Sequence, residues 1–216
     1  ADVLHLSDSL TAAMATTPQV LGMSYVSADF EAVQVSRLGA DFGIRLANLR
    51  DDPIIGSLVV EARDRTEPYW GDPIWSPGPG ATLMNLRTPL RREGKFVGLL
   101  MAVVSVSELS RSLSQDPPQG LVPDRFVLFG RDHVLAHRAM ADGSHARSSS
   151  VALPSLDQVG DPILASIWRE DPRKRVVTSL KGSTRDHIAE IDGMSYTFFY
   201  RSLDGYGPKP LIVGAY

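Results

Sequence analysis

The chain has 216 residues, a length that suits one large domain or two small ones. Hydrophobic residues make up 43% of it and charged residues 22%, as in ordinary globular proteins, so the composition excludes an intrinsically disordered chain. The net charge of −3 offers no basic surface for nucleic acid or an anionic membrane, and the lack of cysteine excludes disulfides, thiolate catalysis and cysteine-ligated zinc.

The chain begins with a predicted helix. Leu6, Leu10 and Met14 recur every four residues and place one apolar stripe on a helix over residues 3–14. Pro18 ends the pattern, because proline disfavours helical backbone in the residue before it. The stripe packs on its own domain, or it ends a longer signalling helix whose outer face pairs with a second subunit. The two interpretations are compatible.

Two strands and a second helix follow. The segments Val20–Ala28 and Phe30–Leu38 are rich in Val, Tyr and Phe, which is typical of strands. Asp52 before Pro53 then indicates a helix start, with Asp52 as N-cap and proline at the first helical position.

The middle of the chain predicts a hairpin that opens with an aromatic loop. The loop carries four prolines and three large aromatic residues, and it leads into a predicted strand, Leu83–Leu90. Glu93-Gly94 is the expected tight turn, and the apolar run Phe96–Val104 is the expected return strand. Ser105 and Glu108 then have the spacing of a capping box, which predicts another helix start.

The segment Ser114–Asp124 contains three prolines and one glycine, so we interpret it as a linker between two lobes. Beyond it, Phe126–Phe129 and His133–Arg138 predict a hairpin, and Ala139–Ser150 is small, polar and expected to be mobile. A second capping box at Ser155–Gln158 follows.

Asp161-Pro162 predicts a further helix start, with an apolar face that includes Trp168. Asp192-Gly193 lies between two β-rich runs and favours a type I′ turn, because both central residues must adopt positive φ. A last strand is expected at Leu211–Tyr216.

Searches for catalytic and metal-binding patterns return little. His133 and His137 have the spacing that binds zinc on a helix, but on a strand they stand about 13 Å apart, too far for one ion. We therefore expect surface or edge histidines and no metal site. No nucleophile elbow is present, and the basic run Arg173–Arg175 is interpreted as a solvated loop.

One group of residues has the make-up of a small-molecule pocket. Aromatic walls with a few placed polar groups line such pockets, and an Arg side chain binds a carboxylate through two hydrogen bonds. The candidate ligand-binding residues are Tyr69, Trp70, Asp72, Trp75, Asn85 and Arg87. The alternative is that the tryptophans belong to the core and Arg87 to the surface.

The order of the segments YWGDP, RTPL, GKFVGLLMAVVS and SELS resembles the first lobe of a double Cache domain, an extracytoplasmic sensor module of bacterial chemoreceptors, histidine kinases and cyclases. The resemblance implies an α+β fold in which a long N-terminal helix accompanies two PAS-like lobes, each a mainly antiparallel sheet with flanking helices. We place the helix at residues 1–18, the membrane-distal lobe at 19–116 and the membrane-proximal lobe at 117–216.

The resemblance also implies a function. It predicts a periplasmic ligand-sensing domain of an inner-membrane receptor that binds a small polar, anionic molecule in the distal lobe and signals to a cytoplasmic cyclase or kinase. No enzymatic activity and no cofactor are expected in the domain itself. A homodimer through the N-terminal helix is expected. Because no apolar run reaches the ~18 residues of a membrane helix and no leader is apparent, we expect the membrane helices outside this sequence.

Two positions depart from the pattern of amino-acid-binding members, which carry Arg two residues before an aromatic pair and Asp at the end of the following strand. Here Arg65 precedes Trp70 by five positions, and Ser105 stands where that Asp is expected. An α-amino group thus loses its carboxylate partner, so the ligand class stays open. Two other functions remain as alternatives: a small soluble hydrolase or lyase that uses His133, His137 or His187, and a dimerising spacer without a ligand.

Overall fold

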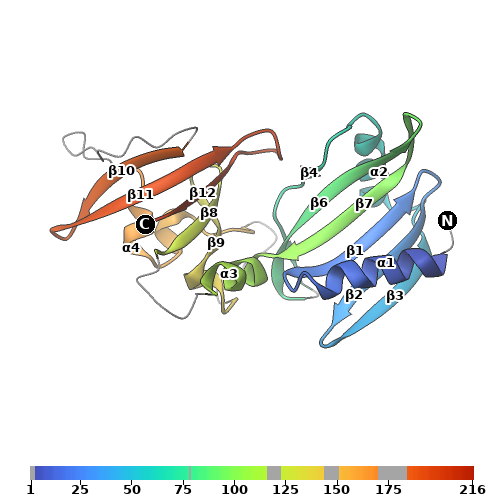
Figure 1. Ribbon diagram of the computed structural model, residues 1–216, viewed down its shortest axis with the longest axis horizontal. Helices are drawn as coiled ribbons and strands as arrows, with labels where there is room; N and C mark the ends of the chain where they lie inside the picture. The colour runs from blue at the N-terminus through green and yellow to red at the C-terminus, as the bar shows by residue number, and fades with distance from the viewer. Residues whose placement is uncertain (1–2, 78, 116–122, 144–150, 170–183) are drawn as a thin grey trace. The chain divides into compact units, whose positions relative to one another are not determined.

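The computed structural model describes residues 3–77, 79–115, 123–143, 151–169 and 184–216. The chain divides into two compact units, each with its own sheet (Figure 1). The first unit comprises Ala1–Asp72 and Leu83–Ser105, and the second comprises Pro73–Thr82 and Val106–Tyr216.

The first unit is built on a sheet whose adjacent strands are antiparallel. In spatial order its strands are β3 (Asp41–Asn48), β2 (Glu31–Leu38), β1 (Val20–Ser27), β7 (Lys95–Ser105), β6 (Ala81–Arg92) and β4 (Tyr69–Trp70), and β5 (Ile74–Ser76) also pairs with β6.

The second unit has a five-stranded antiparallel sheet in the order β10 (Thr184–Ile191), β11 (Met194–Leu203), β12 (Leu211–Ala215), β8 (Arg125–Phe129) and β9 (His133–His137). In both sheets the first strand lies between the second strand and the last one (Figure 1). This shared strand order confirms the predicted α+β fold with two similar, mainly antiparallel lobes.

Helices accompany both sheets. In the first unit α1 (Val3–Ala15) contacts β1 and β2, and α2 (Pro53–Arg63) contacts β7. The second unit holds α3 (Val106–Ser114), α4 (Pro162–Ala165) and two 3-10 turns, η1 (Arg138–Met140) and η2 (Leu156–Gln158). Within the described residues, each of these helices is too short or too polar to cross a membrane.

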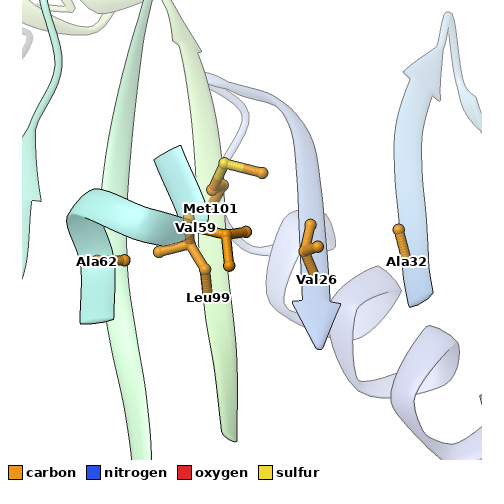
Figure 2. Close-up of a cluster of buried hydrophobic side chains, with 6 residues drawn as sticks. All are labelled: Val26, Ala32, Val59, Ala62, Leu99 and Met101. Atoms are coloured by element: carbon orange, nitrogen blue, oxygen red, sulfur yellow. The ribbon is translucent and has the colours of Figure 1, made fainter. Parts of the chain in front are cut away.

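The core of the first unit lies between α2 and the sheet (Figure 2). Val26 is paired across the sheet with Ala32 on one side and Leu99 on the other, so the three side chains share a face. The buried cluster consists of Val26, Ala32, Val59, Ala62, Leu99 and Met101. Val59 and Ala62 come from α2, which fixes this helix over the centre of the sheet.

The helix α1 covers the opposite face. Arg37 of β2 shares a face with Val33 and Val35, the face turned away from the α2 cluster. Its guanidinium donates hydrogen bonds to the carbonyl oxygens of Met14 and Thr17, at and just beyond the C-terminal end of α1. These bonds satisfy carbonyls that a helix end leaves without an internal partner.

Turn and cap residues behave as the sequence predicts. The Asp52 carboxylate accepts the backbone N–H groups of Ile54 and Ile55 at 2.9 and 3.0 Å, with Pro53 at the start of α2. Both predicted two-residue turns have positive φ at both positions: 53° and 77° at Glu93-Gly94, and 51° and 78° at Asp192-Gly193. The capping box at Ser155–Gln158 is also confirmed, on η2.

Other sequence-based expectations need correction. The strand β3 was not predicted, and part of the aromatic loop forms the short strands β4 and β5. The helix predicted after Asp161 spans only α4 and ends before Trp168. The helix α3 groups with the second unit although we had placed it in the first lobe. Most of the predicted linker and the basic run Arg173–Arg175 lie outside the described residues.

His137 lies on β9, an edge strand of its sheet as expected, but its side chain is fully buried. Its Nδ1 accepts the Ala139 N–H at 3.3 Å, and its Nε2 lies 3.0 Å from the hydroxyl oxygen of Tyr216. That hydroxyl donates to Oδ2 of Asp161 at 2.8 Å. Asp161 also caps α4 by accepting the Leu164 N–H at 2.9 Å. A buried hydrogen-bond chain therefore ties β9, β12 and α4 together.

The direction of proton donation along this chain follows from its partners. Because Nδ1 of His137 accepts a hydrogen bond, the neutral ring carries its proton on Nε2 and donates it to Tyr216. Burial, with the bond to Asp161 as the second cause, raises the pKa of Tyr216 above its ordinary value. The phenol is therefore protonated and donates to the carboxylate at physiological pH.

We expect Tyr216→Phe to lower the free energy of unfolding by about 1–3 kcal/mol, because it leaves His137 and Asp161 without their shared partner in a buried environment. Urea denaturation followed by circular dichroism measures this loss. The exposed Tyr206 provides the matched control, and Tyr206→Phe should change stability by less than about 0.5 kcal/mol. Equal effects of the two substitutions would show that the buried chain contributes nothing.

A pair of neighbouring valines tests the first core. Val59 is fully buried against the sheet, whereas Val60 is 60% exposed. We expect Val59→Ala to cost about 2 kcal/mol, from the lost burial of its methyl groups and the cavity left behind. Val60→Ala should be neutral or slightly stabilising because alanine has the higher helix propensity. The same urea titration distinguishes them, and a neutral Val59→Ala would contradict the packing.

Candidate ligand site

The edge of the first sheet brings part of the predicted site together. Tyr69 on β4 pairs with Arg87 on β6, and Trp70 pairs with Leu86. Successive residues of a strand point to opposite faces, so Tyr69, Arg87 and Asn85 share one face and Trp70 lies on the other. Arg87 also pairs with Met101 of the α2 cluster, so this face is the one that α2 covers.

Arg87 is the centre of the contacts on that face. Its Nη1 lies 3.3 Å from Oε2 of Glu61 on α2, and its Nε donates to Oδ1 of Asn85 at 3.3 Å. The guanidinium carbon stands 5.6 Å from the centre of the Tyr69 ring. A second guanidinium, that of Arg65, lies 4.1 Å from the same ring and 3.1 Å from Glu61. Two arginines thus share one carboxylate and one aromatic ring.

The loop at Gly71 lies close to the Arg87 guanidinium. Gly71 follows β4 and donates its N–H to the carbonyl oxygen of Asn85 at 2.9 Å. A Cβ at position 71 would overlap the Arg87 guanidinium. A side chain at position 71 would therefore require the Arg87 guanidinium to shift.

Tyr69 contributes a buried phenol. Its side chain is 3% exposed, and its hydroxyl oxygen has no hydrogen-bond partner within the described residues. Burial, and then the charge of Glu61, raise the pKa of Tyr69, while Arg87 and Arg65 act in the opposite direction. The hydroxyl therefore stays protonated at physiological pH and is available as a hydrogen-bond donor.

The structure separates the six residues predicted for the site. It brings Tyr69, Asn85 and Arg87 together, and it places Trp70 on the opposite face of the sheet. Asp72 is exposed at the end of the first unit, and Trp75 belongs to the second unit.

Two residues of the cluster, Glu61 and Arg65, were not among the predicted set. Their spacing gave a signal that sequence reasoning could have used, because a Glu and an Arg four residues apart share one helix face, although Arg65 lies just beyond the end of α2. No spacing in the sequence shows that Glu61 also reaches Arg87. The described residues include no group of three or more potential metal ligands.

No family model and no curated protein matches the chain. Solved structures do resemble it in fold. The extracellular domain of a protein described as a histidine kinase, vpHK1S-Z8, is 10% identical with a TM-score of 0.58, over 99% of this chain and 73% of that one. The extracellular domain of mmHK1S-Z3, also described as a histidine kinase, is 13% identical with a TM-score of 0.55, over 99% of this chain and 79% of that one.

A domain of a protein described as a sensory box/GGDEF family member from Vibrio parahaemolyticus is 12% identical, with a TM-score of 0.56 over 99% of this chain and 77% of that one. These similarities extend over both units. The chain therefore has the fold of extracellular sensor domains, which confirms the architecture that the resemblance to double Cache domains implies.

Proposed function

We propose that the chain is the extracytoplasmic ligand-sensing domain of a bacterial transmembrane receptor, on the periplasmic side of the inner membrane, with a cytoplasmic kinase or cyclase as its output. The shared fold with extracellular domains of proteins described as histidine kinases supports this proposal. Fold alone does not name a ligand. The ligand class is inferred from the cluster around Arg87.

The proposed ligand of the first unit is a small polar anion bound at Tyr69, Asn85 and Arg87. The observation that carries this proposal is the Tyr69 hydroxyl, a buried donor without a partner among the described residues, beside an arginine. Leaving a buried polar group unsatisfied costs about 1–3 kcal/mol, so such groups are characteristic of binding sites. For Trp70, Asp72 and Trp75, a part in binding stays a prediction.

The present partners of Arg87 indicate how an anion would be accommodated. Glu61 and Arg87 are joined at 3.3 Å, but the Glu61 side chain is 40% exposed, so this ion pair is partly screened by solvent. A ligand carboxylate bound to Arg87 through two hydrogen bonds would replace Glu61 as its main partner. Glu61 would remain paired with Arg65. Binding would thereby alter the contact between β6 and the last turn of α2.

The test is a thermal-shift screen of small organic acids, followed by calorimetry on each hit. Arg87→Ala should weaken a hit by about tenfold or more, because a hydrogen-bonded charge is lost. Tyr69→Phe should weaken it by a smaller factor while keeping the ring. Arg92→Ala removes an exposed positive charge from the same strand and should leave the affinity unchanged.

Two results would contradict the site. A hit whose affinity is unchanged in both Arg87→Ala and Tyr69→Phe binds elsewhere. The absence of any hit among the organic acids would refute the assignment of an anion.

We further propose that the domain binds without catalysis and needs no cofactor. The runner-up, a hydrolase or lyase that uses His133, His137 or His187, requires a histidine whose ring can reach a substrate. Both ring nitrogens of His137 are engaged in the buried chain. A hydrolytic or lyase activity lost on substituting His133 or His187 would overturn the proposal.

A homodimer through α1 is the proposed assembly. Leu4 of α1 is 72% exposed, and on the α1 face of the sheet the edge strand β3 exposes Ile44 and Leu46 to 54% and 61%. Their cross-strand partners Val35 and Val33 are buried on this face. A second copy of the chain would cover both apolar surfaces at once, because α1 packs on β1 and β2, and β3 is the next strand beyond β2 in the sheet.

Single cysteines placed along residues 3–15 in the membrane-bound receptor test this dimer. We expect the cross-linking yield to peak every three to four positions, with one peak at position 4. The reason is that one face of α1 would contact the same face of α1 in the second subunit. Ser7 is buried inside the unit and serves as the negative control. Equal cross-linking at every exposed position would contradict a specific interface.

A further inference from the structure

The second unit contains a cavity of about 420 Å³ that the proposed function does not use. Its volume falls within the range of small-molecule sites. The cavity lies against one face of β10, β11 and β12, beside the segment that follows α4. Apolar and aromatic side chains from these elements include Ile167, Trp168, Tyr200 and Ile212.

The aromatic walls are held in fixed positions. The Trp168 and Tyr200 rings meet edge to face with centroids 5.6 Å apart. The Trp168 indole donates to the carbonyl oxygen of Arg131 at 2.8 Å, and the Arg131 guanidinium lies 4.3 Å from the indole centre. Arg131 thus already makes a cation–π contact with the Trp168 indole.

His187 supplies a buried polar group at this cavity. The residue is 5% exposed, and its Nε2 has no hydrogen-bond partner among the residues that the structure describes. The ring is stacked on Phe198 at 5.2 Å and meets Tyr200 edge to face at 5.6 Å, so its orientation is set by packing. A buried imidazole nitrogen of this kind calls for a hydrogen-bonding partner that the cavity can hold.

The charged lining residues favour an anion. Arg131 and Arg185 carry positive charge, against the single carboxylate of Asp204, which already accepts a hydrogen bond from Ser202 at 2.8 Å. Arg185 is exposed and makes no ion pair within the described ranges. It pairs across the strands with Tyr200, so its side chain lies on the cavity face, two residues from His187.

We propose that this cavity is a second binding site, distinct from the one at Arg87, for a small carboxylate with an aromatic or cyclic apolar body. Arg185 and Nε2 of His187 bind the carboxylate, and Trp168, Tyr200 and Ile167 enclose the body. The polar half of the recognition comes from β10, and the apolar half comes from β11 and the segment that follows α4. A free inorganic anion would satisfy only the polar half.

Benzoate and cyclohexanecarboxylate are suitable probes, titrated into the ¹⁵N-labelled chain. The chain has three tryptophans, so the spectrum holds three indole N–H signals. The signal that is missing from the spectrum of Trp168→Phe belongs to Trp168 and reports on the cavity. Both carboxylates should shift the Trp168 signal to saturation. Benzamide and benzylamine, which keep the ring without the negative charge, and inorganic phosphate, which lacks the body, should bind at least about tenfold more weakly.

Two variants locate the site. Arg185→Ala and His187→Phe should each reduce benzoate affinity about tenfold, and His187→Phe keeps a ring to stack on Phe198. Arg201→Ala is the matched control, because Arg201 is exposed on β11 but points away from the cavity face. Each variant is compared with wild type by circular dichroism first, and if one fails to fold, the other still tests the site.

The proposal is overturned if neither carboxylate gives a saturable shift at Trp168, if phosphate binds as well as benzoate, or if both variants retain wild-type affinity. A cavity filled only by water gives the first of these results. Trp70 and Trp75 have their own indole signals. Binding confined to the first unit would therefore leave the Trp168 signal unshifted, and this result would also overturn the proposal.

Discussion

The register of the hairpin formed by β6 and β7 determines the face on which each residue of the Arg87 cluster lies. Glu93 and Gly94 both adopt positive φ, so the turn is a tight two-residue one. A register shift at Val97, between the pairs Arg91–Phe96 and Leu90–Gly98, then sets the pairing that reaches Arg87. A slip by one residue would move every side chain of a strand to the opposite face. Arg87 would then leave the α2 side, where Glu61 and the Tyr69 ring meet it.

That register also links the core to the site. Leu99 and Met101 of β7 pack against Val59 and Ala62 of α2, which fixes the last turn of the helix over the sheet. Glu61 lies in the same turn and faces Arg87 as a consequence. The apolar contacts therefore position the ion pair. The contributions to stability agree with this dependence of the ion pair on the core. A partly exposed ion pair contributes about 0–1 kcal/mol, whereas a buried aliphatic side chain contributes about 1.5–3 kcal/mol.

Features set by local chemistry were predictable from the sequence. Asp192-Gly193, Glu93-Gly94, the Asp52-Pro53 helix start and the capping box at Ser155–Gln158 each depend on residues within four positions, and the structure shows all four. The strands β6 and β7 were also predicted, and their ends extend one or two residues beyond the predicted ones. Local backbone preferences are strong enough at these sites to decide the structure.

Features that depend on partners distant in the sequence were not predictable from it. The strand β3 has apolar residues at alternate positions, but it also contains Gly43, which is unfavourable inside a strand. In addition, none of the side chains of β3 is fully buried within the unit. The burial of His137 depends on Tyr216, 79 positions later, and on Asp161. Arg87 and Glu61 are 26 positions apart, and Trp70 shares its loop with Tyr69 but not its face. The prediction grouped Tyr69 and Trp70 because they are adjacent in the sequence, but adjacent residues of a strand point to opposite faces.

The shared strand order gives a reason why both units carry polar clusters at the same place. The edge strand β4 and its neighbour β6 correspond in order to β10 and β11. A tyrosine and an arginine are paired across each of these edges: Tyr69 with Arg87, and Arg185 with Tyr200. In the first unit the buried donor without a described partner is a phenol, and in the second it is the His187 imidazole. An edge pair tolerates such groups because one side of the outer strand has no ladder neighbour, so helices and loops there can leave room for a ligand. The same sheet geometry thus underlies the two proposed sites, and a ligand at either one would act on the edge strand of its own unit.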